Sequence, residues 1–217
     1  MTPKYPRYQD YVIRDGRLVG EFEDMYRDFD DPWHQVADET WATERAVGIC
    51  YLQRLQTRLG ARKVVELGCG LGRYSARIAG TGLQTIGLDI SSTAVERARR
   101  ECPGPGFEVG RLSDYDLLRT LAPDVIVMAE ITWYVLDQLD DFLTFLRTDL
   151  PACSLVHLLT TYAPGKQVYG RDYFTDLPGI LQRFGMHYFE FGQISQPDGG
   201  AKTFFAGTWH ADKLAEW

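Results

Sequence analysis

The chain has 217 residues and a formal net charge of −7 at neutral pH. This length suits a single domain with a substantial buried core, and the negative balance disfavours a surface that follows nucleic-acid phosphates. The sequence contains no apolar run of about 18 residues that would predict a membrane-spanning helix, and no recognisable secretory signal. Its four cysteines form no Cys-x-x-Cys pair, which favours free thiols in a reducing cytoplasm over disulfides or a zinc site.

Residues 1–37 differ in composition from the rest of the chain. They combine an acidic stretch, Glu21–Asp31, with several aromatic residues. A small hairpin of Tyr11–Arg14 and Arg17–Val19 is predicted around an Asp-Gly pair, because these two residues favour short turns with positive φ. The segment is too short to form a domain of its own, so we expect it to fold over the core as a flap.

A strand–loop–helix unit follows the flap. Apolar residues recur every three or four positions over Thr40–Leu59 and predict a helix. A buried strand, Lys63–Leu67, then leads into three glycines at alternating positions, Gly68, Gly70 and Gly72. Glycine adopts positive φ at no steric cost and lets the backbone approach a ligand closely. With a further helix predicted over Leu71–Ala79, this order indicates a loop that holds a nucleotide-like ligand.

The charge around the loop separates two classes of ligand. The next strand, Leu83–Leu88, ends at Asp89, and the spacing from Gly68, about 20 residues, places an acidic side chain on ribose hydroxyls in doubly wound folds. A dinucleotide site would need a glycine where Arg73 stands. Glu66, directly before the loop, suits a ligand with an ammonium and a sulfonium better than one with phosphates.

Two motifs resemble those of the class I S-adenosylmethionine-dependent methyltransferases. They are Glu66-Leu67-Gly68-Cys69-Gly70-Leu71-Gly72 and Ile86-Gly87-Leu88-Asp89-Ile90-Ser91. The resemblance continues through 107–110 and 123–130 and covers roughly residues 38–210. It implies a methyltransferase domain over residues 38–217, preceded by the flap of residues 1–37, and S-adenosyl-L-methionine as the cofactor.

The remaining predicted elements continue the alternation of helices and strands. They are a helix over Ser91–Glu101, strands over Phe107–Val109 and Asp124–Met128, a helix over Leu136–Leu150, a strand over Ser154–Thr160, a helix over Phe174–Phe184, and strands over Met186–Ile194 and Ala201–His210. A final hairpin after five βα units is typical of the methyltransferase sheet, whereas a dinucleotide-binding half would continue with βα units. The predicted fold is therefore α/β, with a doubly wound, seven-stranded, mostly parallel, Rossmann-like sheet whose last strand is antiparallel.

The resemblance also implies the cofactor contacts. These are Glu66, Gly68, Cys69, Gly70, Gly72, Asp89, Ile90, Leu112 and Glu130. Asp89 is expected on the ribose diol, with a helix N-cap as the alternative, and Ile90 on the adenine face. The chain departs from the family at Arg111, where many relatives carry an acidic residue. Asp114 either substitutes for that residue or caps the next helix.

Candidates for catalysis and acceptor binding come from the flap and from the ends of two strands. The candidate catalytic residues are Tyr134, His34 and Glu130, and the candidate acceptor contacts are Trp33, Trp133, Tyr162, Tyr169 and Arg171. Long loops at the ligand edge of a sheet are often functional. The alternatives are core packing for Trp133 and a surface excursion for the loop after the fifth strand. The other histidines, His157, His187 and His210, are predicted to be structural.

The predicted function is S-adenosylmethionine-dependent methyl transfer to oxygen or nitrogen of a small polar acceptor. Asp31-Pro32-Trp33 is similar to the nodulation-protein-S-like methyltransferases, which methylate an amino-sugar nitrogen; this implies a polar acceptor such as a sugar or a natural-product intermediate. No nucleic acid, membrane or metal is expected as a partner, and a homodimer is left open. The alternative is a non-catalytic cofactor-binding regulatory or scaffold protein, supported only by Arg111. A nicotinamide-dependent reductase is the third hypothesis, which the position of Arg73 and the final hairpin disfavour.

Overall fold

A seven-stranded sheet forms the centre of the protein. The computed structural model describes residues 3–35 and 43–217. The sheet has the order β5-β4-β3-β6-β7-β9-β8, in which β9 runs antiparallel to both of its neighbours. Its strands are β3 (Lys63–Leu67), β4 (Gln84–Asp89), β5 (Gly106–Val109), β6 (Val125–Ala129), β7 (Ser154–Thr161), β8 (His187–Ser195) and β9 (Ala201–Thr208). The predicted α/β fold, with its mostly parallel sheet and antiparallel last strand, is confirmed.

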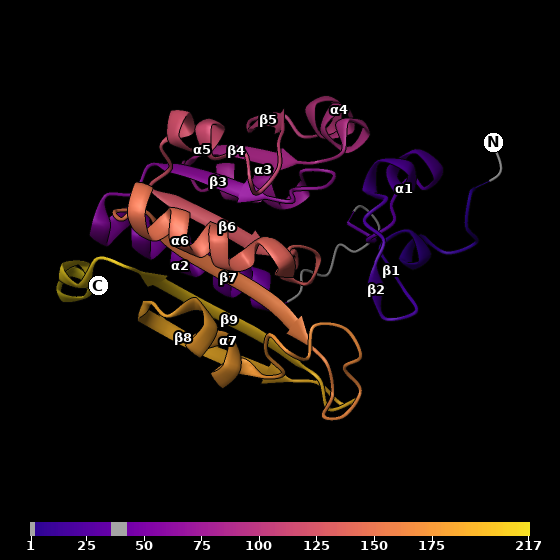
Figure 1. Cartoon of the computed structure of the whole chain (residues 1–217). Helices are drawn as coiled ribbons and strands as arrows, with labels where there is room; N and C mark the ends of the chain where they lie inside the picture. Colours follow the sequence, from indigo (N-terminus) through magenta and orange to yellow (C-terminus); the bar gives the residue numbers. More distant parts are fainter. Residues whose placement is uncertain (1–2, 36–42) are drawn as a thin grey trace.

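Helices cover both faces of the sheet (Figure 1). The inner strands are mostly apolar because both faces of the sheet are buried: Val64 packs against the helices of one face and Val65 against those of the other. The covering helices are α2 (Thr43–Leu59), α3 (Arg73–Ala79) and α4 (Ser92–Glu101), and, on the opposite face, α5 (Tyr115–Leu121), α6 (Leu139–Asp149) and α7 (Leu177–Phe184). No helix among residues 3–35 and 43–217 is long and apolar enough to cross a membrane.

The N-terminal segment folds at one end of the sheet, beyond the arrowheads of the parallel strands in Figure 1. It contains η1 (Tyr8–Tyr11), the hairpin of β1 (Ile13–Arg14) and β2 (Arg17–Leu18), and α1 (Phe22–Asp28). Its small core also includes Leu71 of the glycine loop and Ala94 of α4. The predicted hairpin is confirmed, with Asp15 and Gly16 both at positive φ. The division at residue 37 stays a prediction.

Several element boundaries differ from the predictions for local reasons. The helix expected from Leu71 begins at Arg73, because Gly72 has a φ of 76° and ends the loop. The helix expected from Phe174 begins at Leu177, where the side chain of Asp176 accepts a hydrogen bond of 2.9 Å from the N–H of Gly179. The helix expected over Leu136–Leu150 is divided into η3 (Leu136–Gln138) and α6. Residues 40–42 of the first predicted helix lie outside the described residues.

His157 of β7 is fully buried, in agreement with its predicted structural role. Its ring stacks on Phe205, with centroids 4.7 Å apart, and Phe184 packs edge-on against it. Its Nε2 lies 2.8 Å from Oγ1 of Thr132, while Nδ1 has no partner. Burial disfavours the charged imidazolium and lowers the pKa of His157 from 6.5 to about 3.

We predict that replacing His157 by glutamine removes a pH dependence of stability. The folded pKa lies below the unfolded value, so between pH 6.5 and 3 the unfolded chain takes up a proton that the folded chain does not. The free energy of unfolding should therefore fall by about 1.4 kcal/mol per pH unit through this group as the pH drops below 6.5. Urea unfolding of both proteins at pH 7.5, 6, 5 and 4 measures the difference, in which other titrating groups cancel. Parallel curves would contradict the assignment.

Candidate active site

A cavity of about 370 Å³ lies at the carboxyl ends of β3, β4 and β6. Ligands bind at this edge in open α/β sheets. The sheet side contributes the ends of the strands and the loops that follow them, among them Gly68, Asp89, Ile90, Leu112, Glu130 and Tyr134. The N-terminal segment contributes Phe22, Tyr26, Trp33 and Gln35, and α2 contributes Arg45. The cavity therefore lies between the sheet edge and the flap.

The glycine loop connects β3 to α3 by a sharp turn. Gly68, Gly70 and Gly72 have φ values of 67°, 54° and 76°, a region that other residues adopt only with strain. A side chain at two of these positions would also clash with its neighbours. A Cβ at Gly72 would lie 2.6 Å from the ring of Phe107, and one at Gly70 would lie 2.6 Å from Oη of Tyr26. Of the three glycines, Gly68 lines the cavity. Gly70 and Gly72, together with Cys69, form the body of the loop outside the lining.

Asp89 lies at the end of β4 with its carboxylate oriented by two backbone N–H groups. Oδ2 accepts a hydrogen bond of 2.8 Å from Gly70, and Oδ1 accepts one of 2.9 Å from Ser91. Burial raises the pKa of Asp89 to about 6, against the lowering effect of these bonds. A carboxylate has about four acceptor positions, so Asp89 keeps capacity for ligand hydroxyls. The helix cap belongs instead to Ser91, whose Oγ accepts from the N–H of Ala94.

Glu66 lies beneath the loop and is absent from the lining of the cavity. The residue is 3 % exposed, and its carboxyl group accepts a hydrogen bond from Oγ of Ser75 in α3. Burial raises the pKa of Glu66 to about 7, while Ser75 and the nearby Arg45 oppose this rise. In this geometry Glu66 supports the loop from below, and its charge acts on the site through space.

Glu130 directly follows β6 and has a φ of 64°, a strained value for a residue other than glycine. Its N–H donates to the carbonyl of Leu158, and its carboxylate accepts from both the N–H (3.0 Å) and the Oγ1 (2.8 Å) of Thr160. Burial raises the pKa of Glu130, with Thr160 opposing. Strain of this kind persists where the surroundings hold it, and it is common at functional sites.

Aromatic rings form the wall opposite the sheet edge. The ring of Tyr134 lies 5.5 Å from that of Phe22 and 5.7 Å from that of Trp33, measured between centroids. Tyr8 packs behind Trp33 at 5.1 Å. Burial raises the pKa of Tyr134 above its ordinary value, so its hydroxyl stays protonated at neutral pH. Two of the predicted residues, Trp33 and Tyr134, are thus brought together from segments about a hundred positions apart.

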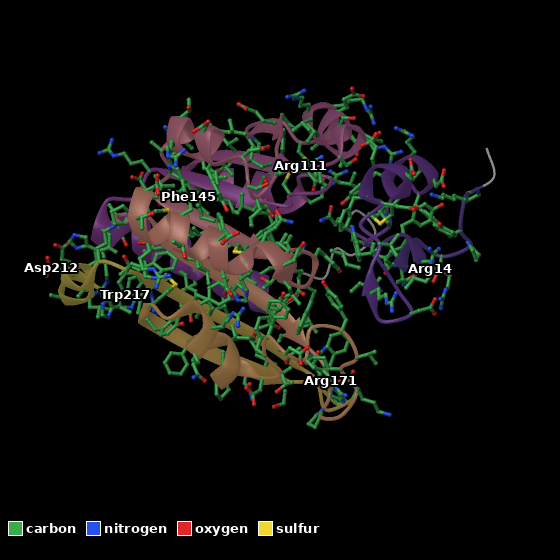
Figure 2. All side chains as sticks on the ribbon, in the orientation of Figure 1. Arg14, Arg111, Phe145, Arg171, Asp212 and Trp217 are labelled. Atoms are coloured by element: carbon green, nitrogen blue, oxygen red, sulfur yellow. The ribbon has the colours of Figure 1, made fainter. Side chains whose placement is uncertain are left out.

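Other predicted residues lie outside the lining of the cavity, and their roles stay predictions. His34 is exposed and contacts Tyr8, and Trp133 is a core residue whose Nε1 donates to the carbonyl of Thr160. The loop after β7 is held against the core by Gln167, whose Nε2 donates to the carbonyls of Tyr169 and Phe174. Tyr162, Tyr169 and Arg171 are absent from the lining. Figure 2 shows Arg171 in this loop, far from Arg111, which lines the cavity.

Asp114 and Arg111 form a local turn. The N–H of Arg111 donates to Oδ2 of Asp114 at 2.7 Å, just before α5. Asp114 is absent from the cavity lining, whereas Arg111 and Leu112 are part of it. Asp114 occupies the position before α5, but its side chain bonds back to Arg111 and makes no capping hydrogen bond to the helix.

Three polar residues of the cavity, Gln35, Arg45 and Gln138, were not predicted from the sequence. Arg45 lies on α2, and its charge opposes the pKa rise of both Glu66 and Glu130. The sequence signal for Arg45 was a basic residue in the first turn of the helix that precedes β3 and the glycine loop. Gln35 accepts a hydrogen bond of 2.8 Å from the N–H of Leu71 through Oε1, a contact that spans 36 positions and leaves no local pattern.

Glu23 docks the flap onto the start of α4. Its carboxylate accepts hydrogen bonds from Oγ of Ser91 (2.7 Å) and from N (3.2 Å) and Oγ1 (2.7 Å) of Thr93. Burial raises the pKa of Glu23, but these bonds outweigh it and hold the pKa at about 2. Arg97 of α4 adds hydrogen bonds to two flap carbonyls. The flap therefore contacts the same helix start that orients Asp89.

Comparisons with known proteins agree with this geometry. A family model described as a methyltransferase domain matches residues 64–148. The chain is 31 % identical over 122 residues to a probable S-adenosylmethionine-dependent methyltransferase of Mycobacterium tuberculosis, covering 55 % of this chain and 43 % of that protein. A second such relative, from Mycolicibacterium smegmatis, is 33 % identical over 89 residues, 41 % of this chain and 33 % of that one. The chain thus spans less than half the length of these curated relatives.

Solved structures share the fold. The N-methyltransferase NodS from Bradyrhizobium japonicum, in complex with S-adenosyl-L-homocysteine, has a TM-score of 0.59 at 18 % identity, with 82 % of this chain and 93 % of that chain covered. Magnesium protoporphyrin IX methyltransferase from Synechocystis has a TM-score of 0.54 at 16 % identity, with 82 % and 94 % covered. The fold and the strand-end cavity define a Rossmann-like domain of the methyltransferase type. The sequence relatives are likewise described as S-adenosylmethionine-dependent methyltransferases, so the chain resembles the class I members of that group in its fold and in part of its sequence.

We predict that Glu23→Gln loosens the flap. The amide keeps the shape of the side chain but loses its charge, and charge-assisted hydrogen bonds are the stronger ones. Amide hydrogen exchange in α1 should become about tenfold faster, which corresponds to about 1.4 kcal/mol. Asp24→Asn is the matched control, because Asp24 is the next residue of the same helix and its ion pairs, with Arg27 and Lys4, are exposed. Equal exchange in both variants would contradict the docking role.

Proposed function

We propose that this protein transfers a methyl group from S-adenosyl-L-methionine to an oxygen or nitrogen atom of a small polar acceptor, such as a sugar or a natural-product intermediate. One observation carries the proposal: a single cavity has the oriented carboxylate of Asp89 at one end and Glu130 with Tyr134 at the other. The first end suits a ribose diol. The second suits an acceptor brought next to a reactive group.

The residues around the first end fit the cofactor chemically. Asp89 offers acceptor positions for two hydroxyl groups, and the apolar side chains of Ile90 and Leu112 suit the faces of an adenine ring. Arg45 supplies a cation for a carboxylate, and Gly68 lets the backbone approach the ligand. When bound, S-adenosylmethionine supplies an already activated methyl group, so the chain itself needs to bind, orient and exclude water.

The chain's own contribution is position and shielding. The flap covers the cavity with Phe22, Tyr26 and Trp33, which excludes water and fixes the approach of an acceptor. An alcohol acceptor or an ammonium acceptor must also lose a proton. Glu130 is the carboxylate best suited to accept it, since burial raises its pKa and Thr160 fixes its orientation. NodS is named an N-methyltransferase, which supports nitrogen as one of the two acceptor atoms.

Asp89→Ala tests the cofactor site. Loss of its carboxylate should weaken binding of S-adenosylhomocysteine by about 10- to 150-fold, equivalent to about 1.5–3 kcal/mol for hydrogen bonds to a charged group. Isothermal titration calorimetry measures the change. Asp114→Ala is the matched control: it also removes an aspartate that accepts from a backbone N–H after a strand, but outside the cavity lining. Failure of the unchanged protein to bind, or equal affinities for both variants, would refute the proposal.

Turnover distinguishes an enzyme from a cofactor-binding scaffold. The protein is incubated with methyl-labelled S-adenosylmethionine and a metabolite extract, and label is sought in small molecules by mass spectrometry. Transfer that is lost in Glu130→Ala and kept in Asp114→Ala supports methyl transfer. Cofactor binding without any labelled product favours the non-catalytic alternative.

A further inference from the structure

The acceptor end of the cavity has an unusual combination of surfaces, an aromatic wall facing a buried carboxylate. Phe22 comes from α1, Trp33 from the end of the flap and Tyr134 from the turn after β6. The centroid of the Tyr134 ring lies 5.5 Å from that of Phe22 and 5.7 Å from that of Trp33, so the three rings are contiguous. Aromatic faces carry partial negative charge and attract cations within about 6 Å of the ring centroid.

Glu130 adds a full negative charge to the same end. Thr160 donates hydrogen bonds to both carboxylate oxygens of Glu130. The positive φ of Glu130 fixes the direction in which its side chain leaves the strand. The charged groups that act on it are Arg45 and Glu44, both from α2, and Glu44 is itself paired with Lys202 at 2.9 Å. Glu130 is therefore held in place by hydrogen bonds that leave further acceptor positions on its oxygens.

Two cations, Arg111 and Arg45, are among the described residues that line the cavity. Arg111 stands next to Leu112 after β5, on the side assigned to the adenine ring. Arg45 acts on Glu66 beneath the glycine loop as well as on Glu130, and the proposed function assigns it to the cofactor's carboxylate. Among the described lining residues, the charge left for an acceptor is that of Glu130, next to three aromatic rings. Anionic groups are disfavoured at such a surface, and cationic groups are favoured.

We propose that the acceptor carries a positively charged nitrogen group, which binds between the rings of Phe22, Trp33 and Tyr134 and the carboxylate of Glu130. This inference rests on the proposed function, because it needs the first end of the cavity to be filled by the cofactor. It assigns the cation to recognition of the acceptor, whichever atom receives the methyl group.

Binding of a matched pair of probes tests the inference. Choline and 3,3-dimethyl-1-butanol have the same shape, but only choline is charged. Each is titrated into protein saturated with S-adenosylhomocysteine, with calorimetry and tryptophan fluorescence as readouts. We expect choline to bind at least tenfold more tightly than the alcohol. Tyr134→Leu and Glu130→Gln should each reduce this preference several-fold, and Tyr134→Phe should keep it because the ring remains. Phe191→Leu, at an exposed ring on β8, is the control and should change nothing.

The outcomes separate this inference from the proposed function. Equal binding of the two probes overturns the inference, as does a preference for choline that persists in Tyr134→Leu. Choline that binds only to protein free of S-adenosylhomocysteine also overturns it, because the wall would then serve the cofactor. If S-adenosylhomocysteine itself fails to bind the unchanged protein, the proposed function fails first.

Discussion

The carboxylate of Asp89 holds together the two backbone turns on which the site depends. One oxygen accepts from Gly70 in the loop after β3, and the other accepts from Ser91 at the start of α4. Both turns depend on bonds from outside, since the loop is built from glycines at positive φ and the first N–H groups of a helix have no partner within the helix itself. Because one buried side chain binds both, the cofactor edge has a single geometry. The same side chain faces the cavity, so one group would serve both the architecture and the proposed ligand binding.

The flap extends this arrangement to the acceptor end. Ser91 gives its N–H to Asp89 and its hydroxyl hydrogen to Glu23 of α1. On the other side, Gln35 accepts from Leu71 in the glycine loop. The flap thus contacts the two turns that Asp89 joins, and these contacts carry Phe22 and Trp33 to Tyr134. The aromatic wall of the cavity is therefore a consequence of how the flap docks, which links acceptor recognition to the integrity of the cofactor edge.

The strand ends and the glycine loop at the proposed cofactor end were predictable from sequence because their signals are local. A buried strand, alternating glycines and an acidic residue at the next strand end lie within a few tens of positions, and each has a direct steric or hydrogen-bonding cause. The acceptor half depends on contacts between distant segments. Helix α1 was missed because its acidic sequence gives a weak pattern, and it is held by Met25, Tyr26 and Glu23 packing on α4 and the loop. Tyr162 and Arg171 were assigned to the cavity from their edge of the sheet alone, but Gln167 holds their loop against the core.

We expect the buried carboxylates in and beneath the cavity to favour a positively charged ligand together, more than any one of them would alone. Burial raises the pKa values of Glu66, Asp89 and Glu130, which means that desolvation of each negative charge is only partly offset by protein hydrogen bonds. A neutral or anionic ligand leaves that cost in place. A cationic ligand offsets it, because opposite charges interact strongly where water is excluded. A sulfonium and an ammonium beside these groups would therefore bind with more favourable electrostatics than neutral isosteres, and the release of a neutral thioether product would be easier than the release of its charged precursor.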